Sequence, residues 1–435
     1  MYVTGSSHLA IFSSNLFGRL CNPPTCHANR NHGFRHIRSS SRPFECSAIH
    51  ASQRILPLER PPDPSSFSSP IDNNDVTPDY DVMGTGYVQN QTRILREWMR
   101  NKQSIICITG AGMSTESGIP DYRGNKGSYF RGHKPIIHHE FMTSSSQRKR
   151  YWARSLVGYS PFANARPNSG HKALAELETR GLIGVDLDEC TNFDRLGFSC
   201  FGHFLDEIDG KDVAARKLSV ITQNVDILHS KAGVKNCLHL HGRGDLIRCM
   251  NCGFTRDRKD YHDELARLNS DWLNEATSSV DGIGDGSKDG SVELRPDGDA
   301  ELHPGVSYDE FILPSCSRCG NAKLEEDLQQ EQRSFFKTDV VFFGDSVPKH
   351  RFDISHAAID AADGVLCIGT SLTVHSAYRL VKRAIEREIP VAILNVGQTR
   401  VEREGLGNGG LVTKLESPIG ETLNGLVEIF DREKS

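Results

Sequence analysis

Two histidines and two cysteine pairs are the residues of this chain best suited to chemistry. The stretch HLHGRGDLIRCMNC carries His239, His241 and one C-x-x-C pair, and a second pair lies far downstream in CSRC. Four thiolates would complete the closed tetrahedral shell of a structural zinc ion. A histidine bound to that ion could not act as a base, whereas a free one near pKa 6.5 could accept a proton around neutrality. The first question is therefore whether either imidazole binds metal.

The cysteine pairs favour one zinc ion held by sulfur alone. Each pair is followed by glycine, in CMNCG and CSRCG, and such glycines often accompany the tight turns around zinc. The interval from 253 to 315 is longer than in simple zinc ribbons, so spacing alone does not decide the point, and a redox motif or unrelated thiols remain alternatives. We expect the metal ligands to be Cys249, Cys252, Cys316 and Cys319. His241 is then free, and because we assign His239 the opposite strand parity, only one of the two should face a cleft.

A glycine-rich stretch, ITGAGMSTESGIPDYRG, predicts a nucleotide site. A strand should run into Gly110, Ala111 and Gly112, followed by a helix start that Ser114 and Thr115 could cap. Glycines let the backbone approach a pyrophosphate, and N–H groups at a helix start attract its charge. Because Thr115 stands where the dehydrogenase fingerprint needs glycine, we expect a dinucleotide handled without hydride transfer. A plain tight turn explains the GAG motif alone equally well.

A second polar cluster, in TQNVDILHSKAG, follows another predicted strand. Gln223, Asn224 and Asp226 stand at its carboxyl end, where open α/β sheets bind ligands. These side chains can bind ribose hydroxyls and an amide, although a polar turn with an Asx hydrogen bond is the structural alternative. We expect His229 and Lys231 to lie in the solvated start of the next segment.

Short apolar runs predict the sheet that would position these groups. They are continuous rather than alternating, which is typical of parallel strands covered on both faces. Helical patterns such as residues 375–389 lie between them, so the fold class is α/β with a doubly wound, parallel sheet. The predicted strands are the stretches 104–110, 218–224, 339–345, 364–370 and 390–396.

The sequence between these runs divides the chain into parts. We expect residues 81–245 and 335–435 to form the large α/β domain, and residues 246–334 to form a small zinc-binding module inserted into it. Within that module, residues 263–276 read as a helix. The stretch 184–215 has no clear period and is too long for an ordinary αβ loop, so we interpret it as an insertion or as translated intron.

The first 45 residues predict an organellar transit peptide. No acidic residue precedes Glu45, serines are frequent, and arginines are spread along the stretch. A disordered tail of accidental composition is the alternative. The arginines are Arg19, Arg30, Arg35, Arg38 and Arg42. Residues 46–80, rich in Pro, Ser and Asp, read as a linker.

Composition excludes several classes of protein. The net charge is −5 and no long basic run is present, which gives no support for nucleic-acid binding. No apolar stretch approaches the roughly 20 residues that a membrane helix needs. The 12 cysteines do not indicate a disulfide framework, given the length of the chain and the organellar address. We expect a monomer without nucleic-acid or membrane partners.

The motifs GAGMSTESGIPDYRG, TQNVD, LHG, two C-x-x-C pairs, VVFFGD, GTSL and ILNVG follow one another in an order that resembles the sirtuin family over about residues 80–435. The stretches PDYRG, RKRYWARSLVGY, HGRGDLIRC and VVFFGDSVP look most like the class II, mitochondrial sirtuin 4-like branch. The resemblance implies a Rossmann-like domain with a small zinc-binding domain, and NAD and an acylated protein lysine meeting in the cleft. It implies NAD-dependent transfer of the acyl group from lysine to ADP-ribose, with release of nicotinamide, in the mitochondrial matrix or, as the weaker alternative, a plastid.

The resemblance also implies roles for individual residues. His241 would be the base and Asn224 would orient ribose or a water molecule. The NAD-binding residues would be Gly110, Ala111, Gly112, Ser114, Ile119, Asp121, Tyr122, Arg123, Gln223, Asn224, Asp226, Gly369, Thr370, Ser371, Asn395, Val396, Gly397 and Ile419. The residues flanking the acyl-lysine tunnel would be Val340, Phe342 and Gly344.

Departures from the family pattern leave alternatives open. Tyr122 stands where many members have Phe, GTSLTVHSA lacks a proline common in other branches, and the interval between the cysteine pairs is long. Protein mono-ADP-ribosylation is one alternative activity, because nothing in the residues separates it from deacylation. A non-catalytic module that binds zinc and nucleotide is the other.

Overall fold

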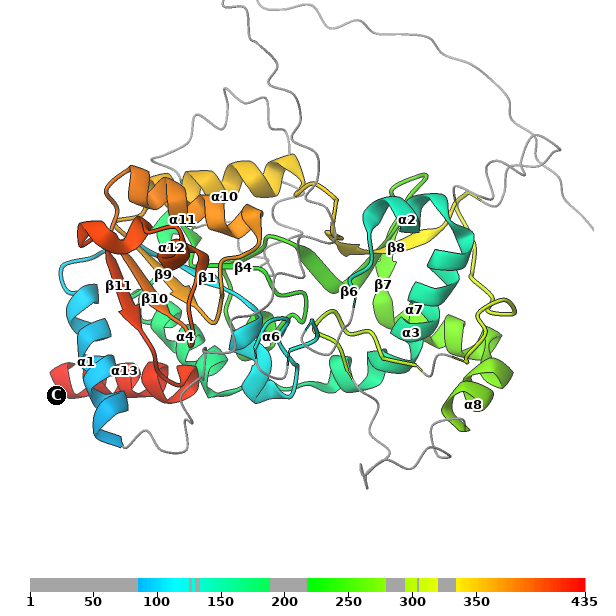
Figure 1. The fold of residues 1–435 in the computed structure, drawn as a ribbon, viewed down its shortest axis with the longest axis horizontal. Helices are drawn as coiled ribbons and strands as arrows, with labels where there is room; N and C mark the ends of the chain where they lie inside the picture. The colour runs from blue at the N-terminus through cyan, green and yellow to red at the C-terminus, as the bar shows by residue number, and fades with distance from the viewer. Residues whose placement is uncertain are drawn as a thin grey trace, which may run out of the picture. The chain divides into compact units, whose positions relative to one another are not determined.

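The computed structural model describes residues 85–124, 127–129, 134–187, 217–278, 294–302, 305–319 and 334–434 (Figure 1). The predicted transit peptide (1–45) and linker (46–80) lie outside the described residues, as does the predicted insertion (184–215) from residue 188 onward. In the part that is described, no helix is both long and apolar enough to cross a membrane.

The central element of the fold is a six-stranded parallel sheet, which confirms the predicted α/β class (Figure 1). Its strand order is β11-β10-β9-β1-β4-β5, so the chain builds outward from β1 in both directions. Ligands of such sheets bind beyond the carboxyl ends of the strands where the order reverses, here at β1 and β9. The strands are β1 (Ile105–Thr109), β4 (Val220–Thr222), β5 (Cys237–His239), β9 (Gly364–Ile368), β10 (Val391–Leu394) and β11 (Val412–Leu415).

Helices cover both faces of this sheet, which explains the continuous apolar runs. On β1, Ile106 and Ile108 face one core and Ile105 and Cys107 face the other, and all four are buried. Burying both faces favours the β-branched residues seen here. The first core is covered by α10 (Lys349–Ala361) and α11 (His375–Glu386), and the second by α1 (Thr85–Met99), α4 (Ser169–Thr179) and α13 (Ile419–Lys434).

A second, antiparallel sheet of three strands has the order β7-β6-β8. The expectation that residues 339–345 form a strand of the parallel sheet is wrong. Residues 336–340 pair antiparallel with β6 instead, and their apolar character serves a separate aromatic core. The strands are β6 (Gly242–Cys249), β7 (Thr255–Asp257) and β8 (Phe336–Val340).

Helices from two parts of the chain pack on this second sheet. Trp152, from the earlier part, stacks edge-on against Tyr261 at 4.7 Å between ring centroids, and its indole N–H donates to the Phe336 carbonyl at 3.0 Å. Residues of α3, far ahead of the cysteine pairs in the sequence, therefore share a core with the antiparallel sheet, in which β6 ends at Cys249. The domain boundaries stay a prediction. The helices are α2 (His138–Thr143), α3 (Ser145–Asn164), α7 (Arg258–Leu268) and α8 (Ser270–Ser278).

The single helix expected over 263–276 is two helices, α7 and α8. Asn269 lies between them, with its amide group donating to the carbonyl oxygens of Leu265 and Ile312 and its side-chain oxygen accepting from the Ile312 N–H. Asparagine competes in this way for backbone groups and so ends helices that a hydrophobic pattern alone would continue.

Candidate functional site

Glycines join the turns that follow β1 and β9. A Cβ atom at Gly110 would lie 2.6 Å from the Cβ of Thr370, and one at Gly112 would lie 3.0 Å from the Cα of Gly369. Gly369 itself has φ +59, the left-handed region that glycine enters without strain, and its Cβ would meet the Met113 nitrogen at 2.5 Å. These positions need glycine because the two turns are packed against each other, which motif reading alone did not indicate.

The turn after β1 leads into a 3-10 helix, η3 (Ala111–Ser117), with Gly110 at its N-cap and no side-chain cap. The expected capping by Ser114 and Thr115 is therefore wrong. The Thr115 hydroxyl donates back to the Gly112 carbonyl at 3.0 Å, and the Ser114 hydroxyl donates to an Asp226 carboxylate oxygen at 2.6 Å. A helix this tight directs Ser114 into the protein, where it is buried.

Asn224 and Asp226 hold this helix from the carboxyl end of β4. The Asn224 amide donates to the Gly110 carbonyl at 3.0 Å and to the Ser114 hydroxyl at 3.1 Å. Asp226 also accepts from the Leu228 N–H at 2.9 Å. Burial raises the pKa of the Asp226 carboxyl, and the hydrogen bonds from Ser114 and Leu228 oppose that rise. The predicted polar cluster is thus a connected network against η3.

Gln223 carries the network across to β9. Its amide donates to the Thr370 hydroxyl at 2.9 Å and to the Thr109 carbonyl at 3.2 Å. One short segment after β4 therefore contacts both glycine turns, and polar groups from three neighbouring strands meet at one edge of the sheet.

His241 lies next to this network, in the turn that connects β5 to β6. Its Nδ1 lies 3.2 Å from the Gln223 carbonyl oxygen and its Nε2 lies 2.7 Å from the Ser376 hydroxyl. A carbonyl can only accept, so Nδ1 carries the proton and Nε2 keeps its lone pair. Loss of solvation lowers the pKa of His241 to about 4, although the residue keeps some exposed surface. The hydrogen bond with the Gln223 carbonyl opposes this shift, and Arg351 makes a smaller contribution that lowers the pKa. The ring is neutral at pH 7.

His239 is buried, 1% exposed, at the end of β5. The parity argument for separating it from His241 was wrong, since residues two apart share a face of an unbroken strand. The end of β5 at His239 separates them, because His241 belongs to the following turn.

His229 was expected near solvent but is buried, 1% exposed. Its Nε2 lies 2.9 Å from the Thr109 hydroxyl, and its ring lies 4.9 Å from that of His171 on α4. Burial lowers the pKa of His171 to about 4, and burial also lowers the pKa of His229 well below its usual value. Alternating polar and apolar residues do not reveal this buried pair, since both histidines look like surface residues of short helices.

The turn after η3 carries three further NAD candidates. Asp121 accepts the Gly124 N–H at 2.9 Å, and burial raises the pKa of its carboxyl. The ring of Tyr122 lies 5.4 Å from that of Tyr129, and the Arg123 guanidinium lies 5.1 Å from the same Tyr129 ring. Burial lowers the pKa of Arg123.

The remaining NAD candidates occupy the turns after β9 and β10 and the start of α13. Ser371 contacts the Thr373 hydroxyl at 3.0 Å, and the Asn395 amide donates to the Val396 and Gly397 carbonyls at 2.7 and 3.3 Å. Ile419 packs against the second core. Ile119 packs in a small buried cluster with Phe162, Val225 and Leu228.

A cavity adjoins Tyr122. Val340 and Phe342, two of the acyl-tunnel candidates, line it, whereas Gly344 is not among its lining residues. Six of its sixteen lining residues are aromatic, which suits an apolar chain, and the charged residues Arg258 and Asp297 also line it. The aromatic lining residues are Tyr122, Tyr151, Tyr159, Phe162, Phe342 and Phe343.

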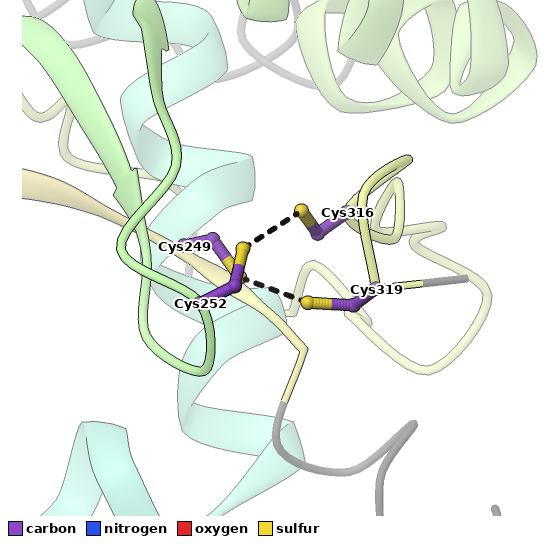
Figure 2. A group of neighbouring side chains, drawn as sticks. All are labelled: Cys249, Cys252, Cys316 and Cys319. Carbon is purple, nitrogen blue, oxygen red and sulfur yellow. Dashed lines mark hydrogen bonds between the residues drawn. The ribbon is translucent and has the colours of Figure 1, made fainter. Parts of the chain in front are cut away.

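The four predicted metal ligands lie together, with their sulfur atoms within 4.8 Å of one another (Figure 2). Sulfur–sulfur distances of 3.7 Å join Cys249 to Cys319 and Cys252 to Cys316. Disulfides have distances of about 2.05 Å, whereas four sulfurs about 2.3 Å from a central zinc stand about 3.8 Å apart. The set fits a closed zinc site.

Neither histidine can reach this cluster. His241 precedes β6 and Cys249 ends it, so the length of an extended strand, roughly 20 Å or more, separates them. Both ring nitrogens of His241 also have other partners.

Comparison with known proteins agrees with this arrangement. The model of a family described as the Sir2 family matches residues 110–198 and 188–376. The chain is 36% identical over 317 residues to the NAD-dependent protein deacylase Sirt4 of Drosophila melanogaster, covering 72% of this chain and 81% of that protein. It is 35% identical over 320 residues to NAD-dependent protein deacetylase 2 of Bradyrhizobium diazoefficiens, covering 74% and 93%. A structure solved under the description "Structural Basis for the Mechanism and Regulation of Sir2 Enzymes" superposes with a TM-score of 0.50 at 23% identity, over 79% of this chain and 99% of that one, which shows likeness of fold.

Proposed function

Because the chain belongs to the Sir2 family, we propose that it is an NAD-dependent protein lysine deacylase that transfers the acyl group to ADP-ribose and releases nicotinamide. The observation that carries the proposal is the position of His241. Its imidazole is neutral, unbound by the cysteine cluster, and hydrogen-bonded to the same Gln223 segment that contacts both glycine turns. A base and a candidate dinucleotide site thus meet at one sheet edge.

In the proposed chemistry the polar residues around Asn224 and the base His241 have separate roles. Breaking the bond between nicotinamide and ribose develops positive charge on the sugar, which a dry, preorganised polar site stabilises. Asn224, Ser114 and Asp226 are hydrogen-bonded before substrate arrives, so they need little rearrangement. In the proposed reaction the acyl oxygen bonds to the ribose as the bond to nicotinamide breaks. His241 Nε2 would then accept a proton from a ribose hydroxyl, and the oxygen of that hydroxyl would attack the acyl carbon. The bond from this carbon to the lysine nitrogen then breaks, the lysine amine leaves, and water opens the cyclic intermediate to give acyl-ADP-ribose.

The acylated lysine is proposed to enter by the cavity beside Tyr122. Val340 and Phe342 line it, and Val341 is tied to the base, because its N–H donates to the His241 carbonyl at 2.8 Å. The edge of the chain at residues 341–344 would pair with the substrate backbone as an added strand. The proposed NAD contacts and tunnel residues are those that the family resemblance implies.

Zinc is proposed to be structural, with Cys249, Cys252, Cys316 and Cys319 as ligands. When bound, the ion would fasten the end of β6 to the distant loop 305–319 and would take no part in acyl transfer. All four ligand positions would be filled by sulfur.

The cellular setting is proposed from the N-terminal composition. An acid-free, arginine- and serine-rich stretch favours import into the mitochondrial matrix, with a plastid as the alternative. Fusing residues 1–84 to a fluorescent protein and locating it in cells tests this, and a diffuse cytosolic signal would contradict it. We further propose a monomer without nucleic-acid partners, which sedimentation at micromolar concentration tests.

The central experiment incubates the protein with NAD and a panel of acyl-lysine peptides. We expect release of free nicotinamide together with acyl-ADP-ribose, and loss of both in His241→Ala at an unchanged melting temperature. ADP-ribosylated protein without acyl-ADP-ribose would instead support the transferase alternative. Full function of His241→Ala in cells, with no nicotinamide release from any peptide, would support a non-catalytic module.

A further inference from the structure

We propose that Ser376 is a positioning residue for His241, whose hydroxyl donates a hydrogen bond to Nε2 and holds the ring as the neutral Nδ1–H tautomer. The proposal rests on the proposed function insofar as His241 acts as a base there. The contact itself is a property of the protein without substrate.

The direction of the hydrogen bond follows from the other side of the ring. Nδ1 lies 3.2 Å from the Gln223 carbonyl oxygen, which can only accept, so Nδ1 must carry the proton. Nε2 then has a lone pair, and the Ser376 hydroxyl 2.7 Å away is the donor. Two hydrogen bonds on opposite sides of the imidazole fix both its tautomer and its rotation.

The backbone around Ser376 makes this position firm. Ser376 is the second residue of α11, whose buried residues Ala377, Leu380 and Val381 pack in the first core. The helix begins directly after the β9 turn that contains Gly369 and Thr370. Ser376 therefore lies on the helix that follows the turn whose Thr370 accepts a hydrogen bond from Gln223. It also lies within the stretch GTSLTVHSA that departs from the family pattern.

A donor to Nε2 stabilises the neutral imidazole and disfavours its protonated form. This agrees in direction with the lowered pKa of His241, which loss of solvation and Arg351 also lower. Arg351, on α10, is paired with Asp339 of β8 at 2.7 Å. At neutral pH Nε2 is therefore unprotonated and accepts the hydrogen bond from Ser376. An entering ribose hydroxyl has to replace only that serine hydroxyl to reach the lone pair.

Nuclear magnetic resonance of the full chain with ¹⁵N-labelled histidine tests the contact without any substrate. The His241 signals are identified by their loss in His241→Gln. We expect the Nδ1–H tautomer in the wild type, and Ser376→Ala to raise the pKa of His241 by roughly 0.5–1 pH unit. Ser376→Thr, which keeps the hydroxyl, should restore the wild-type value. Ser346→Ala, at an exposed position, is the matched control.

Steady-state kinetics provide the second readout. We expect Ser376→Ala to lower kcat roughly 2- to 10-fold and to move the acidic limb of the pH profile upward, with Thr restoring both. A role confined to folding would lower the melting temperature and leave that limb in place. An Nε2–H tautomer, or an unchanged His241 pKa in Ser376→Ala, overturns the proposal. Absence of nicotinamide release by the wild type overturns the proposed function instead and leaves the spectroscopic result standing.

Discussion

The Gly112 N–H donates to the Gly369 carbonyl oxygen at 2.9 Å and so ties the turn after β1 to the turn after β9. These residues are far apart in the sequence, and each belongs to a motif read separately as a phosphate or ribose loop. Their contact makes the two motifs one structure at the point where the strand order reverses. Disturbing either turn should disturb both.

Gly110→Ala tests this coupling. The added Cβ would stand 2.6 Å from the Thr370 Cβ and 2.8 Å from the Gly369 carbonyl oxygen, so both turns must shift. We expect a loss of about 1–3 kcal/mol in the free energy of unfolding and weaker NAD binding. Urea denaturation and isothermal titration with NAD measure these changes. Gly86→Ala, in helix α1 with no atom within 4 Å of its Cβ, should be neutral or slightly stabilising. Wild-type NAD affinity in Gly110→Ala would contradict the coupling.

Asn224→Asp tests the polar network at β4. The substitution replaces the amide donor to the Gly110 carbonyl with a carboxylate, which cannot donate and which would share the Ser114 hydroxyl with Asp226. We expect a loss of about 1–3 kcal/mol in stability from the unpaired buried carbonyl and at least a tenfold fall in nicotinamide release. Asn164→Asp, at an exposed position, should behave as wild type. Unchanged turnover in Asn224→Asp would remove the network from the proposed chemistry.

Cys249→Ser tests the sulfur cluster. Removing one ligand should release the ion and loosen the second sheet, because Cys249 is buried at the end of β6 in the aromatic core. Elemental analysis should fall from one zinc per chain toward zero, with a lower melting temperature. Cys367→Ala alters a buried cysteine of the parallel sheet and should keep its zinc. Zinc-free wild-type protein of normal stability would refute a structural metal.

His171→Gln tests how much the buried His171 lowers the free energy of unfolding at acid pH. The pKa of His171 falls from about 6.5 to about 4 on folding because burial removes its solvation, so the unfolded chain binds more protons between these values. Its stabilising contribution is complete above pH 6.5 and is lost as the pH falls toward 4. We expect His171 to account for about 2 kcal/mol of the stability lost between pH 7 and pH 5.

Urea unfolding at the two pH values measures this loss. His171→Gln should show a shallower pH dependence than the wild type, whereas His139→Gln, at an exposed position, should keep the wild-type slope. Equal slopes for wild type and His171→Gln would show that this ring is protonated in the folded protein.

The sequence predicted the strands β1, β4, β9 and β10 of the parallel sheet because they are buried and read as unbroken apolar runs. It missed β5 and β11, and β11 is only partly buried. It misplaced residues 339–345 because a strand buried by aromatic side chains in another sheet looks the same. The sequence also indicated that the four cysteines lie together and that the polar residues after β4 form a cluster, because spacing or position restricts them. His229 and Ser376 were missed, since their roles depend on contacts with Thr109 and His241 that lie more than a hundred residues away.

Only Leu240 and His241 lie between β5, an edge strand of the parallel sheet, and β6, the central strand of the antiparallel sheet. The imidazole thus belongs to the connection between the two sheets, with its ring nitrogens bonded to Gln223 and Ser376 and its backbone carbonyl accepting from the Val341 N–H. Any twisting of one sheet against its neighbour would pull the ring off its partners. Proton acceptance by His241 would then depend on the two sheets keeping their relative position.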